Sequence, residues 1–375
     1  MKLTLLQENL AKGLTIVNRF VAPKAQLPAL NNVLLTTDKG KLKLSATNLE
    51  MGINYWLGAK VEQEGAISIP AKIFTEFISS LPLEKVVLET KENNLNLNCS
   101  SYQANFVGLP ASEFPAVPTF KGKGGIFFPK DLLLKAITQV SFAAAQDEGR
   151  PNITGVLLII KGEDLVLVAT DGYRLSFKKM IKAQGFTQVE EFKKGIIIPA
   201  RTLTEVGKIM AEQEPEKEIS LAITPGSNQI IFVSPEAEVT SRLIEGSFPD
   251  FERIIPEKET TKVLLEKETF LRAVRTAAIF ARESANIIKF KINKDKLKVS
   301  ANAPQIGDNL IEMEIRVTGE DNKIAFNSRY LLDFLNVVEG EEVTLEMTSP
   351  LNPGVFRCLK DNSFLHIIMP VRVQE

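Results

Sequence analysis

The stretch "ISIPAKIFTEFISSLP" at 67–82 reads as a strand that runs into an amphipathic helix. Two later segments share its order of apolar and polar residues: "IIIPARTLTEVGKIMAE" at 196–212 and "IAFNSRYLLDFLNVVEG" at 324–340. Pro70, Pro199 and Asn327 correspond, at intervals of 129 and 128 residues. Proline suits the first turn of a helix, because its missing N–H would find no partner there in any case. The spacing indicates three copies of one structural unit.

A second helix precedes this strand and helix in each copy. Its three segments are "LLQENLAKGLTIVNRFV" from Leu5, "FPKDLLLKAITQVSFAA" from Phe128 and "LEKETFLRAVRTAAIFA" from Leu265. Apolar residues recur in them with the period of 3.6 residues that marks one buried helix face. Between the helices, "LLTTDKGKLKLSATN", "LLIIKGEDLVLVATD" and "IKFKINKDKLKVSAN" each read as strand, polar turn and strand. Each copy therefore predicts an α+β unit, with two helices packed on antiparallel sheets.

The three copies define three similar domains. We expect a first domain over 1–120, a central domain over 126–250 and a C-terminal domain over 258–375. The stretches "VPTFKGKGG" at 117–125 and "IIPEKETTK" at 254–262 contain the Gly, Pro and charged residues that are typical of linkers. A chain of 375 residues is also too long for one ordinary core.

The composition is that of a soluble globular protein, with 44% apolar and 24% charged residues. The chain has no run of 18 apolar residues, and "MKLTLLQENLAKG" lacks the apolar core of a signal peptide. We therefore expect a cytoplasmic protein with no membrane contact. Cys99 and Cys358 form no CxxC pair, so the sequence predicts neither a disulfide framework nor a metal site. The single histidine, His366, lies in the strand-like "FLHIIMP", which favours a structural role.

The sequence contains no recognisable set of catalytic residues. The sequence has no GxGxxG, GxxxxGK[ST], HExxH or GxSxG motif. Carboxylate pairs such as Glu190 and Glu191 lie in charged stretches that are typical of a solvated surface. A hydrolase built on Asp171 in "ATDG" is the remaining enzymatic alternative, but no His or Lys lies in the same loop. The sequence therefore predicts no catalytic residue and no cofactor.

Positive charge gathers on the first helix of each copy. The windows 7–24, 129–144 and 266–282 hold nine Lys or Arg against four Asp or Glu, whereas the whole chain has a net charge of −1. Ordinary solvated helix faces explain such an excess about as well as a function does. If the three helices line one surface, however, that surface is basic and suits a polyanion backbone without sequence readout.

Four motifs, together with the threefold repeat, resemble one family over the full length. They are "ATDGYRL" at 169–175, "GSFPDFERIIP" at 246–256, "FNSRYLLDFLN" at 326–336 and "MPVRV" at 369–373. Their joint occurrence, each in its expected copy, resembles the bacterial DNA polymerase III beta subunit, the replicative sliding clamp. The family commonly has ATDGHRL at the first motif, so Tyr173 stands where histidine is usual.

The resemblance implies a noncatalytic DNA sliding clamp. Two chains of the DNA-clamp fold would close head to tail into a ring-shaped homodimer, with helices inside and sheets outside. The ring would encircle double-stranded DNA without sequence preference and give processivity to the polymerase. Its implied partners are the clamp loader complex, the DNA polymerase III alpha subunit and other proteins with a clamp-binding motif. The implied location is the cytoplasm, with nucleoid association during replication.

The resemblance also assigns residues to three surfaces. The DNA-facing residues would be Lys12, Arg19, Lys24, Gln146, Arg150, Asn152, Arg272 and Arg275. Ile279 and Phe280 match apolar positions of the dimer interface, although both could equally fill the core of the C-terminal domain. The peptide-binding pocket would comprise Thr170, Gly172, Tyr173, Arg174, Leu175, Pro249, Arg253, Ile254, Ile367, Met369, Pro370, Val371, Arg372 and Val373.

One alternative belongs to a different functional class. A peptide-binding scaffold built from repeats, with no role on DNA, would need the same pocket. The basic first helices would then be ordinary solvated faces.

Overall fold

The computed structural model describes residues 1–22, 26–120, 125–147, 149–180, 189–212, 218–224 and 228–372. Each of the three copies has the predicted pair of helices, together with antiparallel strands. No helix among these residues is long and apolar enough to cross a membrane.

The first copy begins with a strand and a helix that has one buried face. Its helices are α1 (Gln7–Val17) and α2 (Ala71–Ser80), and its strands are β1 (Lys2–Leu6), β2 (Asn32–Asp38), β3 (Lys41–Thr47), β4 (Met51–Gly58), β5 (Lys60–Gln63), β6 (Ala66–Pro70), β7 (Lys85–Lys91), β8 (Asn94–Cys99) and β9 (Tyr102–Val107). Leu10, Leu14 and Val17 of α1 are buried, as the helical period predicts. Pro70 ends β6 and stands at the N-cap position of α2, without a side-chain capping hydrogen bond.

The central copy repeats this order and adds one short helix. Its helices are α3 (Lys130–Val140), α4 (Val189–Lys194) and α5 (Ala200–Ala211), and its strands are β10 (Ile126–Pro129), β11 (Gly155–Lys161), β12 (Asp164–Thr170), β13 (Arg174–Met180), β14 (Ile196–Pro199), β15 (Glu218–Thr224), β16 (Gln229–Val233) and β17 (Ala237–Arg242). The sequence reasoning did not anticipate α4.

The third copy is built on two capped helices. These are α6 (Lys267–Ala281) and α7 (Ser328–Val337), and the strands are β18 (Thr261–Glu266), β19 (Ile287–Asn293), β20 (Lys296–Ala303), β21 (Gly307–Glu314), β22 (Arg316–Gly319), β23 (Asn322–Asn327), β24 (Glu342–Met347), β25 (Gly354–Cys358) and β26 (Asp361–Ile368). The side chain of Glu266 accepts hydrogen bonds from the backbone N–H groups of Glu268 and Thr269 at the start of α6. Asn327 accepts one from Arg329 at the start of α7, the position equivalent to Pro70.

Two of the sheets that these strands form extend from one copy into the next. The five-stranded sheet β5-β1-β7-β8-β9 lies within the first copy, and the four-stranded sheet β21-β20-β19-β23 within the third. The eight-stranded sheet β10-β15-β16-β17-β4-β3-β2-β6 joins the first two copies through β17 and β4. The nine-stranded sheet β14-β11-β12-β13-β26-β25-β24-β18-β22 joins the last two through β13 and β26. Both junctions are therefore continuous antiparallel ladders.

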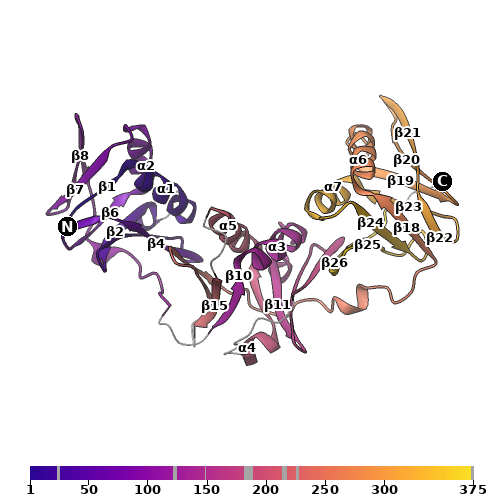
Figure 1. Ribbon diagram of the computed structural model, residues 1–375, viewed down its shortest axis with the longest axis horizontal. Coiled ribbons are helices and arrows are strands. Elements are labelled where there is room, and N and C mark those ends of the chain that lie inside the picture. Colours follow the sequence, from indigo (N-terminus) through magenta and orange to yellow (C-terminus); the bar gives the residue numbers. More distant parts are fainter. Residues whose placement is uncertain are drawn as a thin grey trace. The chain divides into compact units, whose positions relative to one another are not determined.

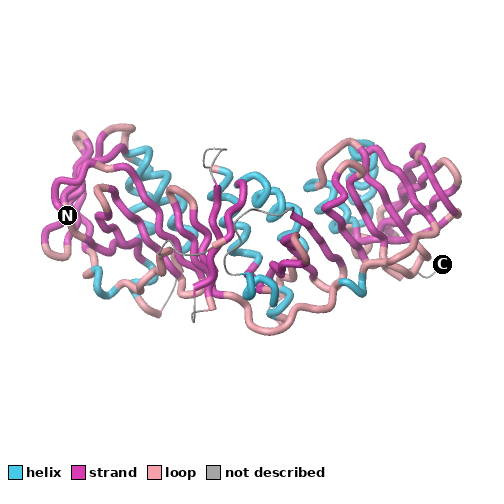
Figure 2. The backbone as a smooth tube through the Cα atoms, turned by 60° about the horizontal axis from the view of Figure 1, so that its bottom comes forward, coloured by secondary structure: helices cyan, strands magenta, loops and turns pink. Residues whose placement is uncertain are grey.

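The chain forms two compact units, and each contains one of these junctions. The first consists mainly of residues 1–131 and 205–243, and the second mainly of 132–182, 190–204 and 244–375. In the second unit, α6 and α7 lie side by side against strands of the third copy (Figure 1). The same pairing of helices with strands is visible for α1 and α2 in the first unit (Figure 2).

The core under α6 and α7 contains a chain of aromatic rings. Phe290 contacts Phe326 at 5.7 Å between ring centroids, Phe326 contacts Phe356 at 5.5 Å, and Phe356 contacts Phe334 of α7 at 5.4 Å. His366 of β26 stacks on Phe334 at 5.4 Å. The histidine is fully buried, so it has the structural place that its strand-like neighbours indicate.

Candidate functional site

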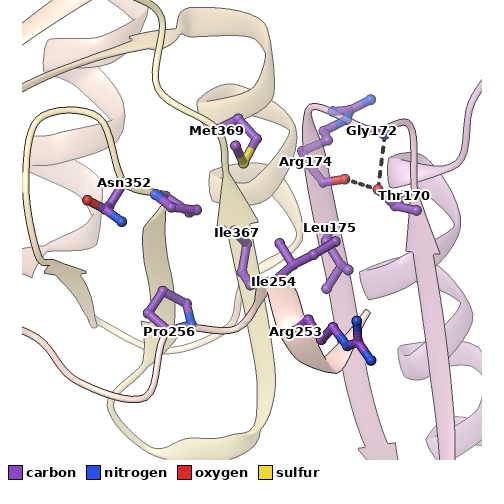
Figure 3. A pocket seen from close by; sticks show the side chains of 11 residues that line it. Thr170, Gly172, Arg174, Leu175, Arg253, Ile254, Pro256, Asn352, Ile367 and Met369 are labelled. Carbon is purple, nitrogen blue, oxygen red and sulfur yellow. Dashed lines mark hydrogen bonds between the residues drawn. The ribbon is translucent and has the colours of Figure 1, made fainter. Parts of the chain in front are cut away.

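A pocket of about 400 Å³ opens beside the junction of β13 and β26 (Figure 3). We call it the candidate pocket. Eight of the residues predicted for the peptide site line it: Thr170, Gly172, Arg174, Leu175, Arg253, Ile254, Ile367 and Met369. They come from the end of β12, from β13, from the short 3-10 turn Glu252–Ile254 and from the end of β26. The fold therefore brings together three segments that are far apart in the sequence.

The floor of the candidate pocket is apolar. Leu175 and Ile367 are paired across the β13–β26 ladder, and both are buried. They belong to an apolar cluster that also contains Phe251, with Ile254 packed against it. Such a floor suits apolar ligand side chains, because their burial against it removes apolar surface from water.

One wall of the pocket is a turn that its own side chains hold in shape. Thr170 Oγ1 donates to the carbonyl oxygen of Arg174 at 2.7 Å and accepts from the backbone N–H of Gly172 at 3.0 Å (Figure 3). Asp171 Oδ1 accepts from the backbone N–H groups of Tyr173 and Arg174. Gly172 has φ +90°, in the region that favours glycine. The carboxylate of Asp171 thus serves the turn, which accounts for its place in the sequence without hydrolytic chemistry.

Arg174 lines this wall, with its guanidinium held by acceptors from three segments. Nε donates to Asp171 at 3.0 Å, Nη1 to Asp333 of α7 at 2.5 Å, and Nη2 to the carbonyl oxygen of Phe142 at 2.8 Å. The guanidinium also lies 4.5 Å from the ring centroid of Tyr330. Only 10% of the Arg174 side chain is exposed.

Arg253 is the contrasting cation of the pocket. Its side chain is 85% exposed and pairs with Asp250, itself 56% exposed, at 2.8 Å. Water screens such an exposed pair strongly, so Arg253 stays accessible to a ligand.

The remaining residues predicted for the peptide site are not among those that line the pocket. These are Tyr173, Pro249, Pro370, Val371 and Arg372, while Val373 lies outside the described residues. The side chain of Tyr173 is exposed, and its carbonyl oxygen accepts a hydrogen bond from the backbone N–H of Met369 at 2.8 Å. The backbone N–H of Val371 donates to the carbonyl oxygen of Ala325 at 2.8 Å, which fixes the chain beyond β26 against β23.

Three lining residues were missed by the sequence reasoning. They are Pro256, Asn352 and Pro353. Pro256 belongs to the stretch that was predicted to be a linker, and the other two follow the end of β24 in an irregular loop. The Asn-Pro dipeptide is a recognisable turn signal, but nothing in it indicates which surface the turn approaches.

The residues predicted to face DNA have different surroundings. Lys12, Arg272 and Arg275 are exposed on α1 and α6, and Arg275 donates to Asn336 at 3.1 Å. Arg19 lies 3.3 Å from Glu212 and 3.9 Å from Glu205, so two carboxylates offset its charge. Lys24 lies outside the described residues.

The loop before β11 points two of its predicted DNA-facing residues at the pocket region. Arg150 donates to the carbonyl oxygen of Asp171 at 3.1 Å, and Asn152 to that of Ser247 at 2.9 Å. Gln146, in the same loop, is exposed.

The two residues predicted for the dimer interface differ in solvent exposure. Ile279 is 61% exposed, whereas Phe280 is half-buried and packs against the core of the third copy. Among the edge strands of the described sheets are β9 and β21, which carry the exposed apolar side chains Val107 and Leu310 respectively. Sheet edges of this kind can extend by pairing with a second chain.

Comparison with protein-family models decides the family. The N-terminal, central and C-terminal domain models of the DNA polymerase III beta subunit match residues 1–118, 128–250 and 252–372. The chain belongs to the DNA polymerase III beta subunit family. The α+β clamp fold with three similar domains, expected from the sequence, is thereby confirmed.

Individual members of the family match over their whole length. A Beta sliding clamp from Synechocystis is 29% identical over 396 residues and covers 100% of both chains. The crystal structure of a DNA polymerase sliding clamp from Bacillus subtilis superposes with a TM-score of 0.93 at 27% identity, over 100% of both chains. A sliding clamp from Pseudomonas aeruginosa bound to griselimycin gives a TM-score of 0.91 at 28% identity, again over 100% of both chains.

Proposed function

We propose that this protein is the DNA sliding clamp of a bacterial replication machinery, a noncatalytic processivity factor. The observation that carries the proposal is the match of three beta-subunit domain models, in order, along residues 1–372. The relatives that match over their full length are beta sliding clamps. Encirclement of DNA requires no active site, which fits an Asp171 carboxylate that is engaged in a turn.

The clamp acts as a homodimer that closes head to tail. Domains 1–120, 126–250 and 258–375 of each chain would supply half of the ring. The sheet edges at β9 and β21, with exposed Ile279, support pairing between the first domain of one chain and the third of the other. Phe280 would support this interface from the margin of the core.

Lys and Arg on the first helices face the DNA. Exposed Lys12, Arg272 and Arg275 can make salt-screened contacts with phosphates, which hold a duplex without fixing its sequence or position. Lys24, Gln146 and Arg19 would add to this surface. Such weak contacts suit a ring that slides. We place the clamp in the cytoplasm, associated with the nucleoid during replication.

The candidate pocket binds short apolar peptide segments of partner proteins. Its apolar floor and its Met369 rim suit interchangeable ligands, because methionine adapts its shape to different side chains. The partners are the clamp loader complex, the DNA polymerase III alpha subunit and other proteins with a clamp-binding motif.

Charge reversal on the first helices tests the DNA role separately from the pocket. The triple variant Lys12→Glu, Arg272→Glu, Arg275→Glu should lower processive synthesis on a primed circular template at least about tenfold, because phosphate contacts become repulsions. Its affinity for a labelled peptide from the clamp-binding segment of the alpha subunit should stay within about twofold of the wild type.

The control reverses two positive charges on a sheet face rather than on the first helices. Lys289 and Lys291 are exposed on β19, and their replacement by Glu should leave processivity unchanged. If both variants lose processivity equally, or if neither variant loses it, the result would favour a peptide-binding scaffold with no role on DNA.

A further inference from the structure

The two internal junctions use the same two strands of the repeated unit. In each, the third strand after the first helix, β4 or β13, pairs with the last strand of the following copy, β17 or β26. The corresponding strands that remain are β21 of the third copy and β9 of the first. Within the described residues, β21 pairs only with β20, and β9 only with β8. We call these two free edges the open junction.

A second copy of the chain fits the open junction. Strand β9 ends a five-stranded sheet and β21 ends a four-stranded sheet, so their pairing would give nine strands, as in the sheet of the second internal junction. Two chains arranged head to tail offer each free edge to the other, and two identical junctions then cover all four edges.

The two internal ladders predict a register for the open one. Ile53 lies opposite Val239 in the first junction, and Ser176 lies opposite His366 in the second. The strand before each junction strand carries an alanine at the same place in "SATN", "VATD" and "SANA". The residues opposite these alanines are Ile53, Ser176 and Asn309. Asn309 is therefore the residue of β21 that is equivalent to Ile53 and Ser176.

The residue of β9 that should face Asn309 follows from a second row of side chains. This row starts four residues before the first helix, crosses the strands and ends on the last strand of each copy. It contains Leu3, Leu88, Leu97 and Ala104 in the first copy, Ile126, Leu221, Phe232 and Val239 in the second, and Val263, Leu345, Phe356 and His366 in the third. Ala104 is therefore equivalent to Val239 and His366.

Backbone hydrogen bonds set the spacing of such a pair. The backbone N–H of Trp56 donates across the first junction at 2.9 Å, and that of Met369 donates to Tyr173 across the second at 2.8 Å. Hydrogen-bonded pairs alternate with non-hydrogen-bonded pairs along an antiparallel ladder, so Ile53 and Ser176 both lie in non-hydrogen-bonded pairs. The Cα atoms of such a pair are about 4.5 Å apart, which a disulfide can bridge.

The amide of Asn309 has a donor that the chain itself leaves unused. Its Oδ1 accepts from the backbone N–H of Ala301 at 3.0 Å, whereas Nδ2 is buried and has no hydrogen-bond partner among the described residues. The equivalent Ser176 forms a 2.7 Å hydrogen bond across the second junction with His366. Because a buried donor without an acceptor is costly, an acceptor from a second chain would stabilise this position.

Each internal junction also has an arginine that pairs with a carboxylate on the second helix of the following copy. Arg19 lies 3.9 Å from Glu205 of α5, and Arg174 lies 2.5 Å from Asp333 of α7. Glu205 and Asp333 are the sixth residues of their helices, and the sixth residue of α2 is Glu76. Glu76 is exposed, and no hydrogen bond or ion pair engages it in the part of the chain that the structure describes.

The third copy has no cation at either arginine position. Arg19 stands twelve residues after the start of α1, and the residue twelve after the start of α6 is Ile279. Arg174 stands two residues before Ser176, and Gly307 two residues before Asn309. Strand β9, with the sequence YQANFV, has no side chain that is charged at neutral pH. The open junction thus has no equivalent of the internal arginine–carboxylate pairs.

We propose that β9 and β21 of two chains pair in the register of the internal junctions, with Ala104 opposite Asn309 of the partner subunit, and without an arginine–carboxylate pair. The backbone ladder and uncharged side chains such as Tyr102, Phe106 and Ile279 hold this junction together. Salt screens charges rather than apolar contacts, so the dimer is nearly insensitive to ionic strength. The inference rests on the homodimer proposed above, and it specifies the register and the chemistry of its interface.

Cysteine cross-linking tests the register. The full-length variant Ala104→Cys, Asn309→Cys would be incubated with oxidised glutathione, and non-reducing gel electrophoresis would measure the linked dimer. More than about half of the chains should become linked, because the pair lies within disulfide distance. The matched control is Ala104→Cys, Ile311→Cys, which moves one cysteine by two positions on the same face of β21. Its Cα atoms would be about 7–8 Å apart, so less than about a tenth should become linked.

Salt and a neutral variant test the chemistry of the interface. Energy transfer between two dye-labelled sets of the wild-type chain, followed on dilution, gives the Kd of the dimer. We expect this Kd to change less than about threefold between 0.1 and 1 M NaCl, although the Debye length falls from about 10 to about 3 Å. Glu76→Gln should leave the Kd within about twofold of the wild type, because Glu76 has no cationic partner to lose. Thermal melting of each variant checks that the fold is intact.

The possible failures are distinguishable. If the wild type is a dimer and the Ile311 pair becomes linked in place of the Asn309 pair, the register is wrong while the homodimer stands. A tenfold weaker dimer in 1 M NaCl or in Glu76→Gln would show that ion pairs hold the interface, against the inference. If sedimentation shows a monomer up to about 10 μM and neither pair becomes linked, the proposed homodimer is contradicted, and the inference falls with it.

Discussion

The junctions β4–β17 and β13–β26 both connect two copies of the repeat, but the polar side chains around the two ladders differ in charge. In both, an edge strand of one copy pairs antiparallel with an edge strand of the next over five residue pairs. Around the first ladder, the polar contacts are mostly neutral: Asn54 accepts from Ser45 at 2.7 Å and donates to the carbonyl oxygen of Pro118 at 3.3 Å. Around the second, charged groups predominate.

The charges of the second junction line one face of β13. Arg174, Ser176 and Lys178 alternate along the strand and so point to the same side. Arg174 pairs with Asp333, Ser176 forms a 2.7 Å hydrogen bond with His366, and Lys178 donates to Asp361 at 2.7 Å and to Ser363 at 2.8 Å.

A carboxylate in each junction shows the difference most clearly. At the first, burial raises the pKa of Glu238, which lies opposite Asn54. At the second, burial also acts to raise the pKa of Asp361, but hydrogen bonds from Lys178 and Ser363 outweigh it and hold the pKa far below the usual range. The candidate pocket is built on the second junction, where paired charges fix the orientation of the strands. Orientation by buried ion pairs is specific, since each charge is costly without its partner.

Loss of Lys178 should have the largest effect on this comparison. The Lys178 side chain is 7% exposed, and Lys178→Met would leave Asp361 with the more distant Lys135, at 3.4 Å, as its cationic partner. We expect a loss of about 3 kcal/mol in the free energy of unfolding, measured by urea denaturation at pH 7. Arg19→Met is the matched change between the first two copies, where Arg19, 28% exposed, pairs with Glu205 and Glu212, and it should cost less than about 1 kcal/mol.

The lowered pKa of Asp361 determines how the stability difference between the wild type and Lys178→Met depends on pH. A carboxylate whose pKa is lowered in the native state stabilises the fold above its unfolded pKa, near 4, and the contribution disappears as the pH falls through the native value. The gap between the wild type and Lys178→Met should therefore narrow below about pH 4. Equal stabilities of the two proteins at pH 7 would show that the charges do not support the junction.

His366 should make the second junction sensitive to mild acid. Burial, and to a smaller extent the charge of Arg174, hold the pKa of His366 well below its usual value, so the native state stays neutral while the unfolded chain takes up a proton near pH 6.5. The unfolded state then binds more protons, and the free energy of unfolding should fall by about 1.4 kcal/mol for each pH unit below 6.5.

The variant His366→Gln isolates this slope. Because the chain has a single histidine, the extra slope between pH 6.5 and 5.5 should vanish in the variant, whereas the dependence below pH 5, due to carboxylates, should remain. The measurement is urea denaturation over a series of pH values. Parallel curves for the two proteins between pH 6.5 and 5.5 would rule out His366 as the source.

Glu238→Gln should have the smallest effect, with the opposite sign from a change at the second junction. A carboxylate whose pKa is raised by burial destabilises the native state at neutral pH, so a neutral side chain of the same shape should be neutral or stabilising by less than about 1 kcal/mol. Asp361→Asn, by contrast, should destabilise the fold. The two melting temperatures at pH 7 check this, and a large loss in Glu238→Gln would mean that the first junction also depends on charge.

The repeat and the paired helices could be predicted from the sequence, because local patterns encode them, whereas the pocket residues were expected only from the family resemblance. Leu10 and Leu14 follow the helical period, and the αL glycine of the turn, Gly172, stands between residues that hold the turn in shape. The extension of sheets from one copy into the next could not be read, since an edge strand and a central strand have similar patterns. The pairing of Arg174 with Asp333 joins residues that are 159 positions apart, and no local signal marks it.

The proposed encirclement of DNA is tested most directly by retention on a circle. The clamp would be loaded by its clamp loader onto a nicked circular plasmid, and gel filtration would measure how much protein stays with the DNA before and after the plasmid is linearised. We predict retention on the circle and release within minutes of linearisation, because a closed ring can leave only over a free end. Equal loss from circular and linear DNA would contradict a topological link.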